Sequence, residues 1–359
     1  MLPPYKYLSY LALLLTPIWH VSPAGASCGT ASCPLDVSRN QNHLLDAKPA
    51  ALTLQLTFER IDQDQPRFGA DKVAFGQIRR PDHDEIKTEN NNVRLLAEYA
   101  LNRRLSFSLT LPLLKRVHSH LANPAHGHDG DHSHDHVGKL ADDDLGGELE
   151  SWNFTRLGDL TAWSHWAPWP HLLSNKADFS LDLGIGLPTG ATGVRNDQGQ
   201  LAEPSLQPGR GAFALLLDSS FEFRQQNAPF FAGHSPARYF ASTFYRINFK
   251  GKDDYQFGNE WVFHLGGQYP LWRRVDLLGQ FVGRWNGRDE PGATGQRTDA
   301  TGGTFVYLSP GLQFDLGQGV SLYGYYQVPV YQNVNQVQIT SNRNLLMGLG
   351  YRLKLLSKI

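Results

Sequence analysis

Residues 105–113 read LSFSLTLPL, with an apolar side chain at every second position. The same alternation recurs in FSLDLGIGL at residues 179–187 and in LLMGLGYRL at residues 345–353. Successive side chains of an extended chain point to opposite faces, so each stretch has one apolar face and one face of small or polar residues. Each stretch is therefore predicted to be a β-strand.

Outward from these stretches, the alternation predicts twelve strands and no helix of comparable length. The predicted strands are residues 51–62, 89–101, 104–117, 153–167, 176–188, 211–224, 237–250, 254–269, 272–286, 302–316, 319–331 and 343–354. Short connections mostly follow the even-numbered strands, and long connections mostly follow the odd-numbered strands. The connection 332–342, after the eleventh strand, is of intermediate length. An even strand count with this segregation is typical of outer-membrane barrels. The predicted fold is all-β: a single transmembrane antiparallel β-barrel over 51–354, with short periplasmic turns and longer extracellular loops.

Composition agrees with a barrel and excludes other classes. The chain has 359 residues, 35 glycines, 11% aromatic residues and a net charge of −1. A balanced charge argues against a nucleic-acid partner, and only residues 8–19 approach the length of an apolar membrane-spanning helix. These residues follow Lys6 and precede the small residues 24–26, so 1–26 is predicted to be a cleaved signal peptide. We expect the outer membrane of a Gram-negative bacterium, with its lipid and the barrel assembly machinery as partners.

The two cysteines, Cys28 and Cys33, lie just after the predicted cleavage site. In an oxidising compartment a pair at this spacing favours a small disulfide loop. A thiolate metal site and a lipid-modified Cys28 remain alternatives. Residues 27–50 are interpreted as a periplasmic N-terminal segment, and 355–359 as a C-terminal tail.

A histidine-rich segment between the third and fourth predicted strands is the most distinctive chemical feature. Half of the chain's 14 histidines lie within residues 118–136, interleaved with aspartates. Neutral imidazoles and carboxylates together bind Zn²⁺, Cu²⁺ or Ni²⁺. We expect an extracellular loop with several competing metal-ligand sets, although no cofactor is required for the fold. The candidate ligands are His118, His120, His126, His128, Asp129, Asp131, His132, His134, Asp135 and His136.

Charged and polar residues occupy the strand face opposite the apolar one. A buried charge is costly unless it is paired or hydrated, so these side chains are predicted to face a polar lumen. They either line a solute path or only pair with one another. The candidates are Glu98, Asp182, Asp218, Glu222, Arg246, Glu260, His264, Arg284 and Arg352.

Short motifs recur in a fixed order along the predicted strands. They are LGDL at 157–160, LPTG at 187–190, LQPG at 206–209, LSPGL at 308–312 and QVPVYQ at 327–332. In this order they resemble the outer-membrane barrel family named for the meta pathway of phenol degradation, whose members are described as candidate transporters. The segment IDQDQPR at 61–67 and the cysteine pair resemble a subgroup of that family. The resemblance implies an outer-membrane location without fixing a substrate.

The function predicted from these observations is passive passage of a small solute, either an organic molecule or a metal ion, through a narrow polar lumen. The alternatives are a structural or metal-sensing barrel without cargo and, least favoured, an outer-membrane lipase. A lipase needs a serine and a histidine on one face, whereas Ser164 and His165 are adjacent and point to opposite faces. The chain is therefore not expected to be an enzyme.

Overall fold

The computed structural model describes residues 35, 50–80, 82–122, 147–169, 176–226, 236–293 and 295–354, and it is built almost entirely of β-strands. The strands are β1 (Ala51–Phe68), β2 (Asp71–Lys72), β3 (His83–Ala100), β4 (Leu105–Ala122), β5 (Glu148–Leu157), β6 (Leu160–Trp166), β7 (Ala177–Leu187), β8 (Ala214–Gln225), β9 (Ala237–Asn248), β10 (Glu260–Trp272), β11 (Val275–Asn286), β12 (Gly303–Gly317), β13 (Val320–Val334) and β14 (Val337–Lys354).

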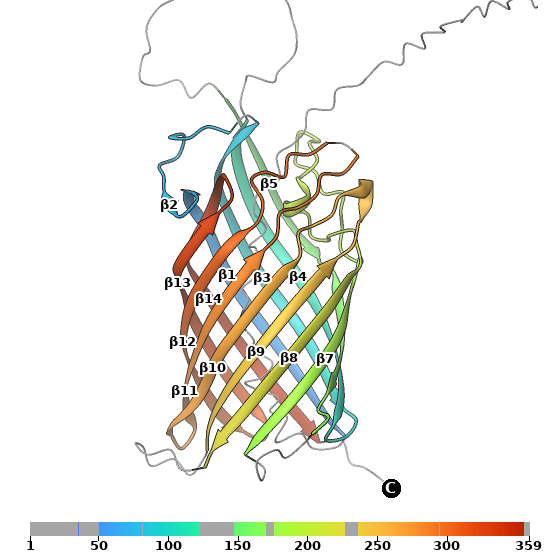
Figure 1. The fold of residues 1–359 in the computed structure, drawn as a ribbon, viewed down its shortest axis with the longest axis vertical. Helices are drawn as coiled ribbons and strands as arrows, with labels where there is room; N and C mark the ends of the chain where they lie inside the picture. Colours follow the sequence, from blue (N-terminus) through green and yellow to red (C-terminus); the bar gives the residue numbers. More distant parts are fainter. Residues whose placement is uncertain are drawn as a thin grey trace, which may run out of the picture.

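The sheet closes on itself because β1 pairs antiparallel with β14, from Ala51 opposite Lys354 onward. Each other strand pairs with its sequence neighbours, apart from two departures. β2 is a two-residue addition beside β1, and β5 and β6 both pair with β4, so they share one place in the wall. The wall therefore has twelve places, as the sequence predicts. Figure 1 shows the tilted strands of this closed barrel.

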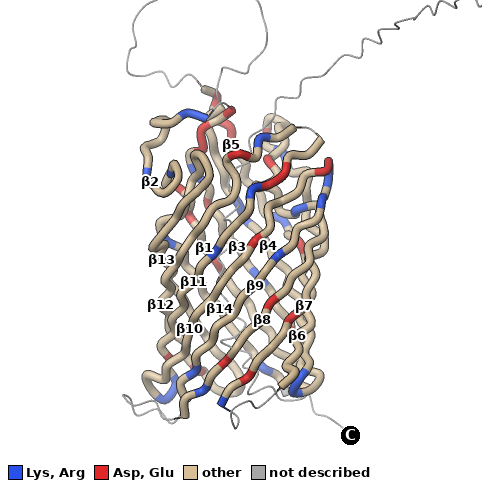
Figure 2. The backbone as a smooth tube through the Cα atoms, viewed as in Figure 1, with Lys and Arg blue, Asp and Glu red and all other residues tan. Residues whose placement is uncertain are grey.

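Alternating burial along the strands gives the barrel an apolar outer surface. On β4, Phe107 and Leu109 are 47% and 51% exposed. Ser106 and Ser108, which alternate with them along the strand, are buried. Charged residues gather toward the two ends of the barrel (Figure 2). An apolar band between polar ends is the surface that a bilayer accommodates, because lipid satisfies no polar group.

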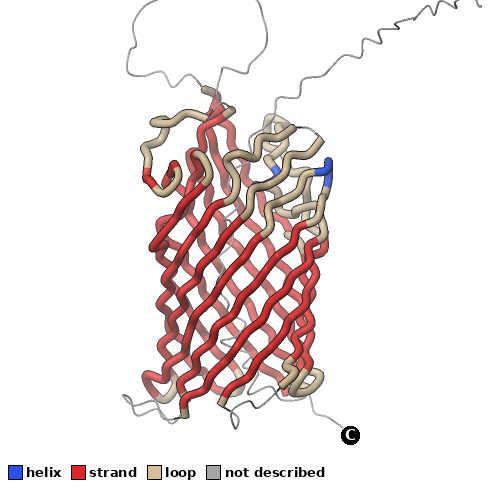
Figure 3. Tube along the Cα trace, viewed as in Figure 1, coloured by secondary structure: helices blue, strands red, loops and turns tan. Residues whose placement is uncertain are grey.

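The loops fall into two sets at opposite ends of the barrel (Figure 3). The end that carries the long loops also carries the short 3₁₀ helices η3 (Pro204–Leu206) and η4 (Lys252–Asp254). Strands β1, β3, β4 and β14 have 18 residues each, whereas about 9–11 residues cross a bilayer. Their outer parts therefore extend beyond the membrane on the long-loop side. Among the residues that the structure describes, no helix is long and apolar enough to span a membrane.

Two of the predicted boundaries near the long-loop end are corrected by the structure. The predicted intermediate loop 332–342 is a turn at 335–336, because β13 runs to Val334 and β14 begins at Val337. The predicted strand 153–167 is broken at Gly158 and Asp159 into β5 and β6. The break makes room for a loop that folds into the mouth, as described below.

The barrel interior is not polar throughout. An interior cluster contains Leu278, Val282, Phe305, Tyr323 and Leu346, each at most 2% exposed. Leu35 belongs to the same cluster and is 6% exposed, so this residue lies inside the barrel, where its apolar side chain is shielded from water. Of the predicted periplasmic segment 27–50, only Leu35 and Ala50 belong to the described residues, so that assignment stays a prediction. The predicted signal peptide, Cys28, Cys33 and the tail 355–359 lie outside the described residues.

Candidate solute pocket and histidine cluster at the barrel mouth

The loop 188–213, between β7 and β8, is fastened into the break between β5 and β6. The carboxylate of Asp159 accepts the backbone N–H of Gly190 at 2.9 Å and that of Arg210 at 2.8 Å. A Cβ on Gly190 would lie 2.6 Å from the Cα of Gly209 and 2.9 Å from the carbonyl carbon of Gly158. Only glycine allows backbones to approach this closely. The motifs LGDL, LPTG and LQPG, far apart in sequence, thus meet at one point.

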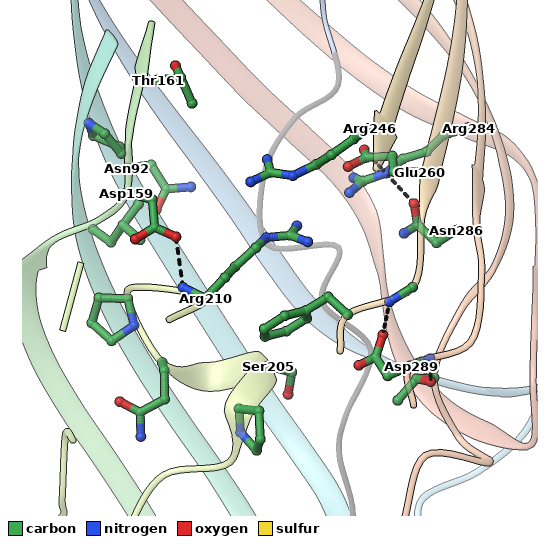
Figure 4. Close-up of a pocket in the computed structure, with 18 of the residues that line it drawn as sticks. Asn92, Asp159, Thr161, Ser205, Arg210, Arg246, Glu260, Arg284, Asn286 and Asp289 are labelled. Atoms are coloured by element: carbon green, nitrogen blue, oxygen red, sulfur yellow. Dashed lines mark hydrogen bonds and ion pairs between the residues drawn. The ribbon is translucent and has the colours of Figure 1, made fainter. Parts of the chain in front are cut away.

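This fastened loop forms one wall of a pocket inside the mouth of the barrel. The pocket has a cavity volume of about 290 Å³, and the strands β3, β4 and β9 to β11 contribute to its other walls. Its charged lining residues are Glu59, Arg94, Arg116, Asp159, Arg210, Arg246, Glu260, Arg284 and Asp289. Figure 4 shows Arg210 and Arg246 reaching into the pocket from opposite walls. A cavity of this size is at the lower end of the range for small-molecule sites.

Three of the arginines donate hydrogen bonds only to neutral oxygens. Arg116 donates from Nε to Asn90 Oδ1 at 2.7 Å and from Nη1 to the carbonyl oxygen of Ser205 at 3.0 Å. Arg246 donates from Nε to Asn248 Oδ1 at 2.9 Å. Arg210 donates from Nη1 to the same oxygen at 3.2 Å. No carboxylate of the described residues lies within ion-pair distance of these three guanidinium groups.

Arg210 also packs against an aromatic ring. Its Cζ lies 4.9 Å from the ring centroid of Phe257. Such a cation–π contact holds the guanidinium in place and leaves its N–H groups directed away from the ring face.

The acidic residues of the pocket form ion pairs or accept hydrogen bonds from groups other than these three arginines. Glu59 pairs with Arg94, and Glu260 Oε1 lies 2.8 Å from Arg284 Nε. Asp159 accepts the two backbone N–H groups described above. Asp289 accepts the hydroxyl of Tyr255 at 2.5 Å and the backbone N–H of Gly258 at 2.8 Å. The five guanidinium groups and four carboxylates that line the pocket give it a formal net charge of +1. The positive excess lies at Arg116, Arg210 and Arg246, which donate hydrogen bonds to neutral oxygens alone.

The pair of Tyr255 and Asp289 joins two loops at the long-loop end of the barrel, 249–259 and 287–302. Burial raises the pKa of the Asp289 carboxyl, against the hydrogen bonds that it accepts. Burial together with the negative charge of Asp289 raises the pKa of the Tyr255 hydroxyl. Because the phenol stays protonated, it remains a donor that holds the two loops together.

The structure corrects the position of two predicted loop histidines. His118 and His120 belong to β4, which runs to Ala122, and both are buried. They continue the inward-facing series of Ser106 and Ser108, because all four occupy even positions of one regular strand. His126, His128, Asp129, Asp131, His132, His134, Asp135 and His136 lie outside the described residues.

Sequence reasoning missed His83 and Glu85, which join these histidines from the neighbouring strand. A register shift between Glu85 and Lys87 marks a β-bulge in β3. The extra residue turns His83 and Glu85 to the same interior face as Thr88. Glu85 then lies opposite His120 in the register, and Thr88 opposite His118. The sequence gives no signal of the bulge, so 63–88 is predicted to be a loop.

The structure places the predicted lumen residues on the buried side of their strands. Asp182, Glu222, His264 and Arg284 are buried, and Glu98, Asp218, Arg246, Glu260 and Arg352 are half-buried. Arg246, Glu260 and Arg284 come together at the pocket. The others lie elsewhere along the wall: Ser106 Oγ donates to Glu98 at 2.9 Å, and Ser242 Oγ lies 3.1 Å from His264 Nδ1.

Asp182 belongs to a Ser–His–Asp series that the sequence did not reveal. His165 Nδ1 lies 3.2 Å from Asp182 Oδ2, and His165 Nε2 lies 2.9 Å from Ser108 Oγ. This is the hydrogen-bond order of a hydrolytic triad. Ser108 is only 4% exposed, and none of the three residues lines the pocket. Asp182 also lines a second, shallow pocket with Ser164 and Trp166, and Ser108 does not line that pocket.

Comparison with models of known protein families found no match, and no curated protein is similar in sequence. The barrel is similar to an outer membrane channel from Pseudomonas putida F1, with a TM-score of 0.53 and 13% identity over 85% of this chain and 96% of that chain. A FadL homologue of Pseudomonas aeruginosa gives a TM-score of 0.39 and 11% identity over 93% and 99% of the two chains. The first likeness shows that the chain has the fold of Gram-negative outer-membrane barrels. The resemblance to the phenol-degradation family stays a prediction.

Proposed function

We propose that this barrel is an outer-membrane channel for the passive passage of a small solute, and that the solute carries a negative charge. The observation that carries the proposal is the trio of Arg116, Arg210 and Arg246, which donate their hydrogen bonds to amide and carbonyl oxygens. Carboxylate and phosphate groups bind guanidinium groups through paired hydrogen bonds. Rings of arginine or lysine select anions in other pores.

The position of the trio supports a role in entry. Arg210 is supplied by the extracellular loop 188–213, whereas Arg116 and Arg246 are supplied by the wall strands β4 and β9. An anion that enters between the loop and the wall would contact guanidinium groups on both sides. It would gain the charge-assisted bonds that the neutral partners do not provide, which favours anions over cations of equal size.

The proposal includes the cellular setting predicted from the sequence. The chain would reach the outer membrane of a Gram-negative bacterium after cleavage of residues 1–26, with lipid and the barrel assembly machinery as its partners. The aspartates and histidines at 126–136 would bind Zn²⁺, Cu²⁺ or Ni²⁺ at the extracellular side. Deleting 124–146 tests the loop alone, since these residues lie outside the described strands.

Two rival functions make different predictions. A structural or metal-sensing barrel would conduct no solute. A hydrolase would use Ser108, His165 and Asp182, but Ser108 is only 4% exposed, and we propose that these residues stabilise the wall.

Liposome swelling with the purified protein separates a channel from a sealed barrel. The channel predicts faster swelling in a small monocarboxylate than in a neutral solute of equal size, and faster in both than for protein-free liposomes. Swelling at the protein-free rate in every solute would support the structural barrel.

A further inference from the structure

A second group of titratable side chains lies beside the arginine pocket, and the proposed passage of solute does not use it. The group joins the outer parts of β3, β4 and β5 to the loop 188–213. Its members are Arg80, His83, Glu85, His118, His120, Glu150 and Glu203.

The centre of this group has the composition and spacing of a metal site. His83, His120 and Glu203 each offer one ligand atom, and these atoms lie within 4.8 Å of one another. His83 Nε2 is 3.2 Å from Glu203 Oε1, and its ring stacks on that of His120 with centroids 4.1 Å apart. All three residues are at most 4% exposed. Two imidazoles and a carboxylate are a ligand set that binds Zn²⁺.

A second observation at the same place also points to a cation. Glu85 is 4% exposed, and its Oε2 accepts no hydrogen bond from the described residues. The other oxygen, Oε1, lies 3.2 Å from His83 Nε2 and 3.6 Å from Arg80 Nη1. The group as defined holds three carboxylates and one guanidinium. With neutral imidazoles it therefore has an excess of negative charge, which a divalent cation would balance.

The surroundings hold the candidate ligands in place. His120 Nε2 lies 2.8 Å from Glu150 Oε2, and such a carboxylate commonly fixes the tautomer and orientation of a ligand histidine. Gln200 donates to the other oxygen of Glu150 at 2.6 Å. Trp152, which is 2% exposed, packs against the ring of His120 with centroids 5.0 Å apart and covers this side of the group.

We infer that His83, His120 and Glu203 bind a divalent transition metal ion, with Zn²⁺ as the ion that best fits the ligand set. Glu203 directly precedes η3, whose Pro204 and Ser205 line the arginine pocket. One bound ion would therefore tie the loop 188–213 to strands β3 and β4. This inference is independent of solute passage and of metal binding by residues 126–136.

The test uses the purified full-length protein in detergent after removal of metal with a chelator. Zn²⁺ is titrated in competition with a chromophoric chelator, and Co²⁺ is added separately as a spectroscopic probe. The variants are His83→Gln and Glu203→Gln. The controls are His264→Gln, a buried histidine on β10 outside the group, and a deletion of residues 124–146. Heat-modifiable migration on gels checks that each variant is folded.

We expect one tight Zn²⁺ site in the wild type, weakened by about 10- to 100-fold or more in each of the two variants. The His264→Gln and deletion proteins should keep that site. Co²⁺ should give visible absorption bands of a low-symmetry nitrogen and oxygen site in the wild type, a readout that does not depend on the folding of any variant. The inference is overturned if the tight site persists in both variants, if the deletion removes it, or if wild-type protein gives neither tight Zn²⁺ binding nor Co²⁺ bands.

Discussion

The guanidinium groups of Arg210 and Arg246 share a single acceptor, the side-chain oxygen of Asn248, at distances of 3.2 Å and 2.9 Å. One arginine comes from the loop 188–213 and the other from strand β9. A neutral amide positions the two positive groups without cancelling their charge. The account of an anion-selecting mouth depends on this arrangement, because a carboxylate at the same place would neutralise it.

Asn248→Asp directly tests whether a neutral acceptor at position 248 is needed for anion selectivity. The substitution keeps the oxygen that accepts from both arginines and adds a negative charge beside them, so anion selectivity in planar bilayers should fall by at least half. Asn102→Asp, on a short turn at the opposite end of the barrel, is the matched control. Unchanged selectivity of the Asn248→Asp channel would show that the two arginines do not face the permeating ion.

Asp159→Ala should loosen the loop 188–213. The substitution leaves the backbone N–H groups of Gly190 and Arg210 without their acceptor, at a cost of about 1–3 kcal/mol. That cost corresponds to roughly 5- to 150-fold faster trypsin cleavage after the exposed Arg195, if cleavage follows local opening. Asp197→Ala, an exposed position of the same loop, is the control. Equal cleavage rates in the two variants would mean that Asp159 does not fasten the loop.

Zn²⁺ should protect the same loop from trypsin. If opening of the loop breaks the bond between Glu203 and the ion, a free Zn²⁺ concentration of 100 times the dissociation constant suppresses that opening by about 100-fold. Glu203→Gln should remove this Zn²⁺-dependent protection, measured as the ratio of cleavage rates without and with Zn²⁺ for the same variant. Protection that survives in Glu203→Gln would place the relevant ion elsewhere.

Ser108 should not behave as a catalytic nucleophile. A fluorophosphonate probe should leave the folded protein unlabelled, because Ser108 is only 4% exposed and lines neither the arginine pocket nor the pocket beside Asp182. Ser108→Ala should lower the melting temperature by a few degrees through loss of the 2.9 Å contact with His165. Labelling of the wild type that disappears in Ser108→Ala would favour the hydrolase instead.

The closed barrel could be predicted from the sequence because strand period and loop length are local signals. If the two-residue alternation is continued along β4, His118 and His120 fall on the face that points into the barrel, because both are even-numbered like Ser106 and Ser108. The prediction ended the strand at residue 117 because histidines and aspartates interrupt the apolar face there. In fact the apolar face ends where the strand leaves the membrane, and the strand continues to Ala122.

The histidine cluster and the pocket depend on features that the sequence does not display. His83 and Glu85 face inward only because a bulge shifts the register of β3, and a bulge is one residue without a composition signal. Arg116 and Arg210 were missed for different reasons. Arg116 lies next to Lys115 near the end of a predicted strand, whereas Arg210 depends on the docking of a loop against Gly158, about 50 residues earlier. Tertiary contacts of this kind decide which charges meet.

The reversal potential of single channels in a KCl gradient tests the central claim most directly. Wild-type channels should be anion-selective, and the triple variant Arg116→Gln, Arg210→Gln and Arg246→Gln should be non-selective or cation-selective, because the remaining arginines are paired with Glu59 and Glu260. Arg156→Gln, an exposed arginine on β5, should keep the wild-type potential. A wild-type channel that prefers cations, or a triple variant with unchanged anion preference, would contradict the account.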